Sequence, residues 1–256
     1  METVTTITAL SDNFTYLYPC GENGAVVIDP GESSKVLRIL KEQGLEPAMV
    51  LCTHHHRDHV GGAGELKIKT GCEIVGGDGD RIAGIDRVVV DGEVLIVGKT
   101  KIEVISTPGH TRTSVCYYIC PSGARESGIL WTGDTMFAGG CGRILECDAV
   151  TMLGSLEKLA LLPDETLVYP GHDYTMENYE FALSIERNNQ AVTQRQHEVQ
   201  QALLQGRQTV PTTMGLERLT NIFLRSGEAR VKAALGMANA EAVEVFAALR
   251  RRKDVF

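Results

Sequence analysis

The most informative segment of the sequence is Cys52-Thr53-His54-His55-His56-Arg57-Asp58-His59-Val60-Gly61-Gly62. Within six consecutive positions it holds four of the seven histidines of the chain, together with one aspartate. An apolar run, residues 48–51, precedes the cluster and a helix-like segment follows it, which is the usual place of an active-site loop. A histidine tag lies at a terminus and lacks a carboxylate, so the pattern favours a loop of metal ligands.

Around this loop the first two-thirds of the chain alternate short apolar runs with turns and a few helical segments, which predicts a sheet-rich layered domain. From about Met176 onward, helix formers with helical spacing replace this alternation, so we expect a catalytic domain of residues 1–175 and a helical domain of residues 176–256. Strands are expected at residues 14–18, 25–28, 87–90, 94–97, 102–106, 115–120, 128–132 and 166–169, and helices at residues 33–43, 64–70 and 148–161.

Helices are also expected on either side of Pro211, and the last helix is expected to begin after Asn239, a good N-cap. Ala242, Phe246 and Leu249 would form its inward-facing stripe.

Three further ligand-type residues follow strand-like segments and a glycine. They are His110 in "STPGHTRTS", Asp134 in "LWTGDTMF" and His172 in "VYPGHDYT". A glycine lets the backbone turn sharply and present one side chain at the edge of a sheet. A single loop histidine is usually only solvated, but three such positions beside a dense cluster indicate a shared metal site.

The number of ligands is enough for two ions, and an aspartate with two carboxylate oxygens can bridge them. His55 alternates to the opposite side of the loop, and His197 lies in the helical tail as an ordinary surface histidine, so neither is counted. The expected ligands are His54, His56 and His110 for one ion, Asp58, His59 and His172 for the other, and Asp134 as the bridge.

Composition restricts the partners of the chain. Its 256 residues are 43% hydrophobic, enough for a full core, and its net charge of −8 argues against a general nucleic-acid binder. The basic run at residues 250–253 is either a local anion-attracting patch or a solvated helix end. No signal peptide or membrane span is apparent, and seven unpaired-looking cysteines suit reduced thiols. We therefore expect a cytoplasmic monomer without membrane partners.

The pattern His-x-His-x-Asp-His, followed by a spaced His, a Gly-Asp and a Gly-His, resembles the metallo-β-lactamase superfamily. This resemblance implies an α/β (α+β) fold, an αββα sandwich with a dinuclear metal site at one edge, over roughly residues 1–175. The segments "FAGGCGRILE", "YPGHDYTMENYEFA" and "LRRRKDVF" resemble the hydroxyacylglutathione hydrolase (glyoxalase II) family, and that likeness extends over the C-terminal helical domain.

In that family, basic and tyrosine side chains hold the glutathione moiety. The matching positions here are Arg143, Tyr174, Arg250 and Lys253, the last two on one helical face because of their i, i+3 spacing. Leu145 stands where the family often has tyrosine, which removes a phenolic hydrogen bond and leaves room for a different thiol carrier.

The resemblance implies hydrolysis of a glutathione thioester, S-D-lactoylglutathione, to glutathione and D-lactate by a metal-bridging hydroxide. Asp58 and Asp134 would be the catalytic carboxylates, with Asp58 ligating one ion and orienting the hydroxide. Two divalent ions are the expected cofactors, zinc first, although the same ligands also accept iron or manganese.

Several alternatives stay open. A glutathione persulfide dioxygenase has this fold with a single iron, and a thioesterase could act on another thiol carrier. A non-enzymatic reading is a structural metal-binding protein, but structural zinc is usually enclosed by four ligands. A β-lactamase is disfavoured by the missing export signal, and a nuclease by the acidic charge.

Overall fold

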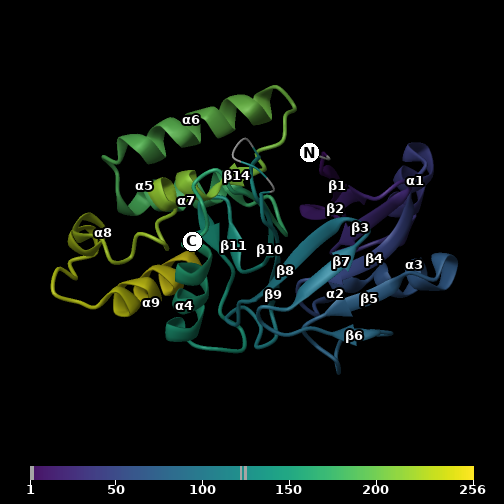
Figure 1. Cartoon of the computed structure of the whole chain (residues 1–256). Coiled ribbons are helices and arrows are strands. Elements are labelled where there is room, and N and C mark those ends of the chain that lie inside the picture. The colour runs from purple at the N-terminus through teal and green to yellow at the C-terminus, as the bar shows by residue number, and fades with distance from the viewer. Residues whose placement is uncertain (1–2, 122, 124–125) are drawn as a thin grey trace. The chain divides into compact units, whose positions relative to one another are not determined.

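The structure is a computed structural model that describes residues 3–121, 123 and 126–256 (Figure 1). The chain forms two compact units: Met1–Thr107 with Thr113–Gly133, and Pro108–Arg112 with Asp134–Phe256. The boundary predicted between residues 175 and 176 separates a catalytic from a helical domain, whereas these units are defined by contacts. The predicted domain boundary therefore remains a proposal. Within the described ranges no helix is long and apolar enough to cross a membrane.

The first unit contains a six-stranded mixed sheet whose strands follow chain order (Figure 1). The first three strands pair antiparallel, and the last four, counted from β3, pair parallel. Parallel β3 and β4 end at the same edge, so the residues that follow them become neighbours. The strands are β1 (Thr5–Ala9), β2 (Asn13–Cys20), β3 (Gly24–Ile28), β4 (Glu46–Cys52), β5 (Glu73–Gly76) and β6 (Arg87–Val88).

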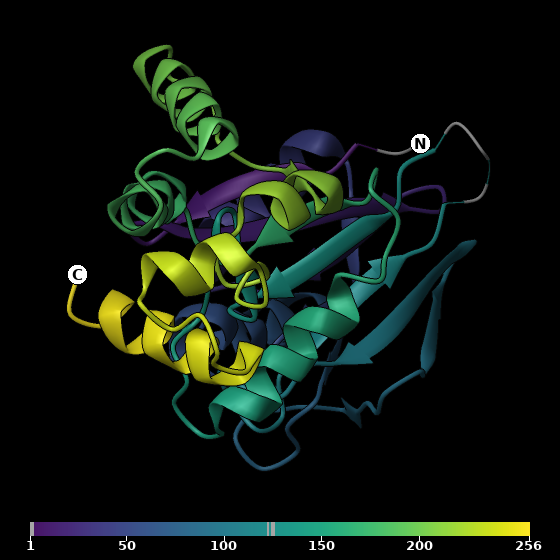
Figure 2. The same ribbon diagram turned by 90° about the vertical axis from the view of Figure 1, so that its left-hand side faces the viewer.

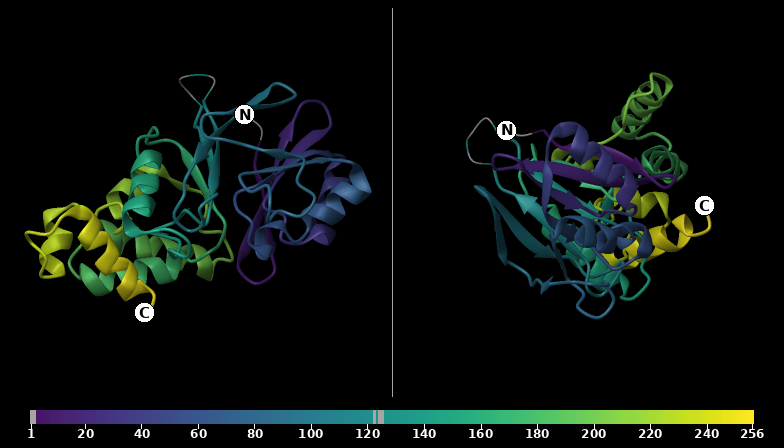
Figure 3. Two further views of the ribbon diagram at one scale, coloured as in Figure 1. Left: turned by 90° about the horizontal axis from the view of Figure 1, so that it is seen from below. Right: turned by 90° about the vertical axis from the view of Figure 1, so that its right-hand side faces the viewer.

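Helices α1 (Ser33–Gln43) and α3 (Ala63–Thr70) lie on one face of this sheet (Figure 3). Val36 and Leu40, one helical turn apart on α1, are buried against the sheet. They belong to one apolar core that also contains Val50 of β4. This layer of side chains fixes the strands whose ends carry the ligand loop.

The first unit also contains antiparallel strands in the order β10-β9-β8-β7. The hydroxyl of Tyr117 in β9 donates to the carbonyl of Cys52 at the end of β4, at 2.9 Å. This buried bond joins the two sheets at the strand that leads into the loop of histidines. The strands are β7 (Val94–Val97), β8 (Thr100–Ser106), β9 (Val115–Ile119) and β10 (Ile129–Gly133), close to the predicted bounds.

The second unit contains the short hairpin of β11 (Met136–Phe137) and β12 (Gly140–Cys141). Strand β13 (Leu167–Pro170) pairs with β14 (Thr212–Thr213). Helices α4 (Ala149–Leu159) and α9 (Ala242–Lys253) lie side by side (Figure 2). The other helices of this unit are α5 (Thr175–Ile185), α6 (Gln190–Leu204), α7 (Met214–Thr220) and α8 (Ala229–Ala234).

The prediction that the last helix starts after Asn239 is wrong by two residues. Glu241 is the N-cap of α9, and its backbone N–H donates to the Glu244 carboxylate at 2.8 Å. A capping box of this kind satisfies a backbone donor of the first turn, which fixes the start of the helix. Of the predicted inward stripe, Phe246 and Leu249 are fully buried, whereas Ala242 is only partly buried.

Candidate metal centre

The ligand loop, residues 54–59, follows β4 and turns into the one-turn helix α2 (Arg57–Val60). Gly62 closes the turn, and its backbone N–H donates to the carbonyl of Pro30 at 2.7 Å. A Cβ on Gly62 would lie 2.5 Å from the carbonyl carbon of Glu32, closer than any real contact. Only glycine lets the turn after β3 approach the loop this closely.

Within the first unit the loop brings its imidazole and carboxylate groups together. His54 Nε2 lies 3.0 Å from His56 Nδ1, and His59 Nε2 lies 3.5 Å from Asp58 Oδ2. His54 and His59 are almost completely buried, whereas His56 and Asp58 are partly exposed. Asn13 donates to Asp58 Oδ2 at 2.9 Å, which orients this carboxylate. The four predicted ligands of this unit therefore form one cluster.

Asp29 supports this cluster, and the sequence analysis missed its role. The side chain accepts from Thr53 N–H at 2.7 Å and lies 2.9 Å from His59 Nδ1. A carboxylate that accepts from Nδ1–H leaves Nε2 available as a metal ligand. Asp29 has φ of 50°, a conformation that aspartate tolerates better than most residues. The available signal was an aspartate directly after β3, the strand parallel to β4.

His55 is engaged elsewhere. Its Nε2 lies 3.2 Å from an Arg81 guanidinium nitrogen, and its Nδ1 lies 3.8 Å from Asp78. Burial raises the pKa of Asp78, but hydrogen bonds from Thr113 and Arg81 outweigh it and hold the value at about 2. Asp78 is thus an anion that helps to hold the Arg81 side chain beside His55. These contacts suit a residue outside the ligand set.

In the second unit Asp134 lies between two imidazoles. His110 Nε2 is 3.4 Å from Asp134 Oδ2, and His172 Nε2 is 3.5 Å from Asp134 Oδ1. All three residues are buried, and the side chain of Asp134 is the most exposed of them at 11%. The two oxygens of Asp134 therefore face different histidines, as a bridging carboxylate requires.

Both histidines are oriented by their surroundings. His110 Nδ1 lies 2.8 Å from the carbonyl oxygen of Arg143, and since a carbonyl only accepts, Nδ1 donates. His172 stacks on the ring of Tyr174 with 4.9 Å between centroids and an angle of 7° between the planes. The edge of Phe137 approaches both of these rings. Each imidazole is thus held with Nε2 toward Asp134.

These separations fit metal ligands. Two ligand atoms at about 2.0–2.1 Å from a tetrahedral ion lie about 3.3 Å from one another. The His110–Asp134, His172–Asp134 and His59–Asp58 distances of 3.4, 3.5 and 3.5 Å agree with that value and exceed a good hydrogen bond. Buried imidazole and carboxylate groups at this spacing are suited to a divalent cation.

The residues expected to bind substrate are all in the second unit, and they differ in exposure. The side chain of Arg143 is 70% exposed, with Nε 4.0 Å from Asp254 Oδ1. Arg250 is 6% exposed, donates to the carbonyl of Cys141 at 2.8 Å and contacts Asp254 at 3.1 Å. Arg250 therefore has a structural role at the end of the hairpin, whatever else it binds.

Lys253 is half-buried beside two aromatic rings. Its Nζ lies 5.6 Å from the centroid of Phe181 and 5.1 Å from that of Phe256, and it donates to the carbonyl of Glu177 at 3.2 Å. Burial lowers the pKa of this amine. An ammonium has three donors, so the contact with Glu177 leaves capacity for an anionic ligand.

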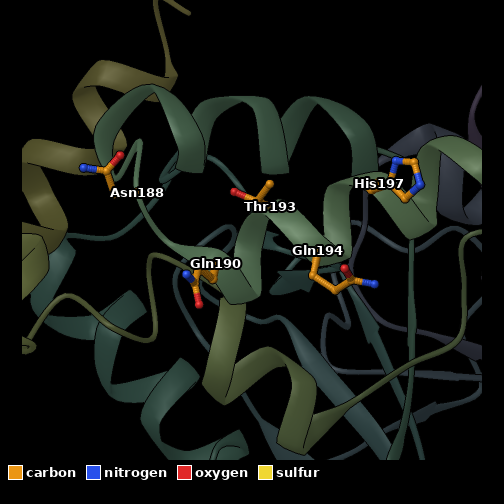
Figure 4. A pocket seen from close by; sticks show the side chains of 5 residues that line it. All are labelled: Asn188, Gln190, Thr193, Gln194 and His197. Atoms are coloured by element: carbon orange, nitrogen blue, oxygen red, sulfur yellow. The ribbon is translucent and has the colours of Figure 1, made fainter.

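His197 lies apart from these groups, on α6. It is exposed and lines a shallow polar hollow of about 540 Å³ with Asn188, Gln190, Thr193 and Gln194 (Figure 4). In the described part of the chain, no group of three potential metal ligands includes it. Its surroundings are those of a surface histidine.

Two protein-family models together match nearly the whole chain. Residues 8–172 match the metallo-beta-lactamase superfamily, and residues 173–256 match the hydroxyacylglutathione hydrolase C-terminus. A hydroxyacylglutathione hydrolase of Rhodospirillum rubrum is 46% identical over 98% of this chain and 97% of its own length. One from Methylococcus capsulatus is 42% identical over 98% and 97%.

Solved structures share the fold. ETHE1 from Myxococcus xanthus has a TM-score of 0.69 and 26% identity, and the match covers 97% of this chain and 90% of that one. TTHA1623, in a di-iron-bound form, has a TM-score of 0.61 and 27% identity over 87% of this chain and all of its own. This fold, together with the clustered His and Asp groups, supports binding of divalent metal.

Proposed function

The chain belongs to the hydroxyacylglutathione hydrolase family of the metallo-β-lactamase superfamily, and from this premise we propose that it hydrolyses S-D-lactoylglutathione to glutathione and D-lactate. Its membership makes it a metal-dependent hydrolase and confirms the predicted family and fold. The observation that carries the proposal is similarity at 46% identity over nearly the whole length of both chains, including the C-terminal helices.

The ligand assignment is part of the proposal. His54, His56 and His110 would hold one ion, and Asp58, His59 and His172 the other, with Asp134 between them. The distances within each unit and the buried imidazoles support it. Divalent ions held there, zinc first and iron or manganese as alternatives, lower the pKa of water toward neutrality and polarise a carbonyl group.

The protein side chains prepare this chemistry. Asp29 and the carbonyl of Arg143 accept hydrogen bonds from Nδ1–H of His59 and His110 respectively, which leaves each Nε2 as a ligand. Asn13 fixes Asp58, whose carboxylate would orient the attacking water. Together, the carboxylates of Asp58 and Asp134 would supply two negative charges, which would offset part of the charge of two divalent ions. The departing thiol has a pKa of about 8.5, so it leaves as a thiolate with little acid assistance.

Arg143, Tyr174, Arg250 and Lys253 would hold the glutathione moiety. Exposed Arg143 and half-buried Lys253 have donors that an anionic ligand can use. The Tyr174 ring lies against His172, which would place a bound thioester beside the metal ligands. Arg250 would act through its buried bond to Cys141 as well as through its charge.

The test is the hydrolysis rate of S-D-lactoylglutathione by protein whose metal content is measured in the same sample. Efficient turnover with two ions per chain, lost on chelation and restored by zinc, is the expected result. A full metal site without turnover would exclude this substrate and leave a thioester of another carrier. Oxygen consumption with glutathione persulfide by a one-iron protein would favour a dioxygenase.

The proposal also includes a monomer in the cytoplasm, with a small thioester as its partner rather than nucleic acid or membrane. The net charge of −8 and seven cysteines that are all free thiols support it. Light scattering of the purified protein would test the monomer, and a mass of two chains would reject it.

A further inference from the structure

The hairpin of β11 and β12, residues 136–141, is connected to each of the three proposed metal ligands of the second unit, through the chain, a hydrogen bond or a ring contact. Asp134 lies two residues before it, and Gly142 after it donates to the carbonyl of Thr135. The next carbonyl, of Arg143, accepts from His110, and the Phe137 ring lies against His172. A shift of this hairpin would therefore move or reorient all three ligands.

The tip of the hairpin is held by buried polar side chains from far along the chain. Asn178 on α5 donates to the carbonyl of Ala138 at 3.1 Å. Glu217 on α7 accepts from the N–H of Gly139 at 2.9 Å. Asn221, which follows α7, donates to the carbonyl of Gly140 at 2.9 Å. We call Asn178, Glu217 and Asn221 the hairpin clamp.

Glu217 is the centre of the clamp. It is fully buried, and besides Gly139 it accepts from the Thr212 hydroxyl at 2.8 Å and from the Asn221 amide at 2.9 Å. Three donors converge on its two oxygens, so this position needs an acceptor. A buried carboxyl group is costly unless it is hydrogen-bonded, and an apolar residue would leave the Gly139 N–H without its partner.

We propose that the hairpin clamp consists of positioning residues, which set the geometry of His110, Asp134 and His172 for metal binding. The inference rests on the proposed metal-dependent function. The clamp gives the C-terminal helices a second role. Neither Glu217 nor Asn178 is among the residues proposed to hold the substrate. The clamp acts on the ligands through the hairpin backbone and not by touching substrate.

The experiment compares zinc affinity, by competition with a chromophoric chelator, for the full-length protein and three variants. Glu217→Ala should weaken zinc binding about 10-fold, as loss of outer supports of a metal site does. Glu217→Gln should restore affinity to within about twofold, because its amide oxygen still accepts from Gly139 and its amide nitrogen can donate to Thr212.

The matched control is Glu186→Ala. Glu186 is also buried in the second unit, where it pairs with Arg225 at 2.6 Å, but it has no bond to the hairpin. This variant should lose comparable stability to urea yet bind zinc within about twofold of the wild type. Equal zinc affinities for Glu217→Ala and Glu186→Ala would overturn the proposal and leave Glu217 with a structural role only.

Should Glu217→Ala fail to fold, Asn178→Ala takes its place, because it removes one donor and opens little space. Its zinc affinity should fall about 3- to 10-fold, with kcat recovering when zinc is in excess. An unchanged affinity would again overturn the clamp. If instead the wild type itself bound no divalent ion, the proposed function would fail, and the clamp would lose the centre that it serves.

Discussion

The ligand sets of the two units are built in opposite ways. In the first unit the four proposed ligands lie within residues 54–59, and their main support, Asp29, lies directly after the neighbouring parallel strand. In the second unit the three proposed ligands come from positions up to 62 residues apart, 110 to 172, and the residues of the hairpin clamp lie as far along the chain as Asn221. The end of one strand is enough to position ligands that are contiguous in the sequence. Ligands that are far apart in the sequence need several elements to hold them in place.

The units also differ in what else they carry. Every residue expected to hold glutathione, from Arg143 to Lys253, belongs to the second unit. Substitutions in the first unit should therefore change metal binding and turnover but leave KM near the wild-type value. Substitutions in the second should change metal binding or substrate binding, depending on the residue.

Asp134→Ala should have the largest effect, because it removes the carboxylate that faces both His110 and His172. Loss of several kcal/mol of metal-dependent stabilisation predicts a fall in kcat/KM on the order of 10³-fold, together with lower metal content. Metal content and turnover should be measured on one sample. His197→Ala, an exposed histidine of the same unit, should leave both unchanged. Normal metal content with a normal rate for Asp134→Ala would remove Asp134 from the site.

Asp29→Asn tests the local support in the first unit. The amide cannot accept from Thr53 and His59 as the carboxylate does, so the His59 ring loses its fixed orientation. Zinc affinity should fall about 10- to 100-fold while KM at saturating zinc stays near the wild-type value. Asp86→Asn, at an exposed carboxylate that pairs with Lys67, is the control. A raised KM with intact zinc affinity would contradict the division between the units.

The sequence predicted that the polar side chains of residues 54–59 lie together, because these residues are contiguous in one loop. The strands β2, β3 and β7 to β10 and the helices α1, α3 and α4 also lie close to their predicted positions. The strands Thr5–Ala9 and Glu73–Gly76 were missed, since each is short and has only one or two strongly apolar residues, too few to define a strand pattern. The local sequence pattern was enough to predict the type of the longer elements. The two missed strands depend on pairing with neighbouring strands, which the local pattern does not show.

The supports of the second ligand set could not be predicted. In the sequence Glu217 and Asn178 are ordinary polar residues of helices, which usually face solvent. Their burial depends on where α5 and α7 lie, and no local pattern gives that. Arg250 shows the same limit, because a run of four basic residues predicts an exposed patch, yet this residue is 6% exposed. Polar residues that pack inward are visible only in the folded chain.

Lys253→Ala tests whether substrate binding belongs to the second unit. Loss of one charge-assisted contact at a half-buried site should raise KM about 10-fold, with kcat and zinc content close to wild type. Steady-state kinetics with S-D-lactoylglutathione would measure the split. Arg251→Ala, an exposed cation two residues away on the same helix, should change KM little. An unchanged KM for Lys253→Ala would mean that the end of α9 does not hold the thiol carrier.

Leu145→Tyr should have the smallest effect on kinetics, and it tests whether glutathione is the thiol carrier. Leu145 is 57% exposed, so a tyrosine fits there without crowding the core. If glutathione is the natural carrier, the added phenol should lower KM by roughly 3-fold, as one neutral hydrogen bond contributes about 0.5–1.5 kcal/mol. Leu145→Phe supplies the ring without the hydroxyl and should leave KM unchanged. A higher KM for Leu145→Tyr alone would indicate that the site has diverged toward another thiol carrier, and would place the specificity of this chain in the second unit by an independent route.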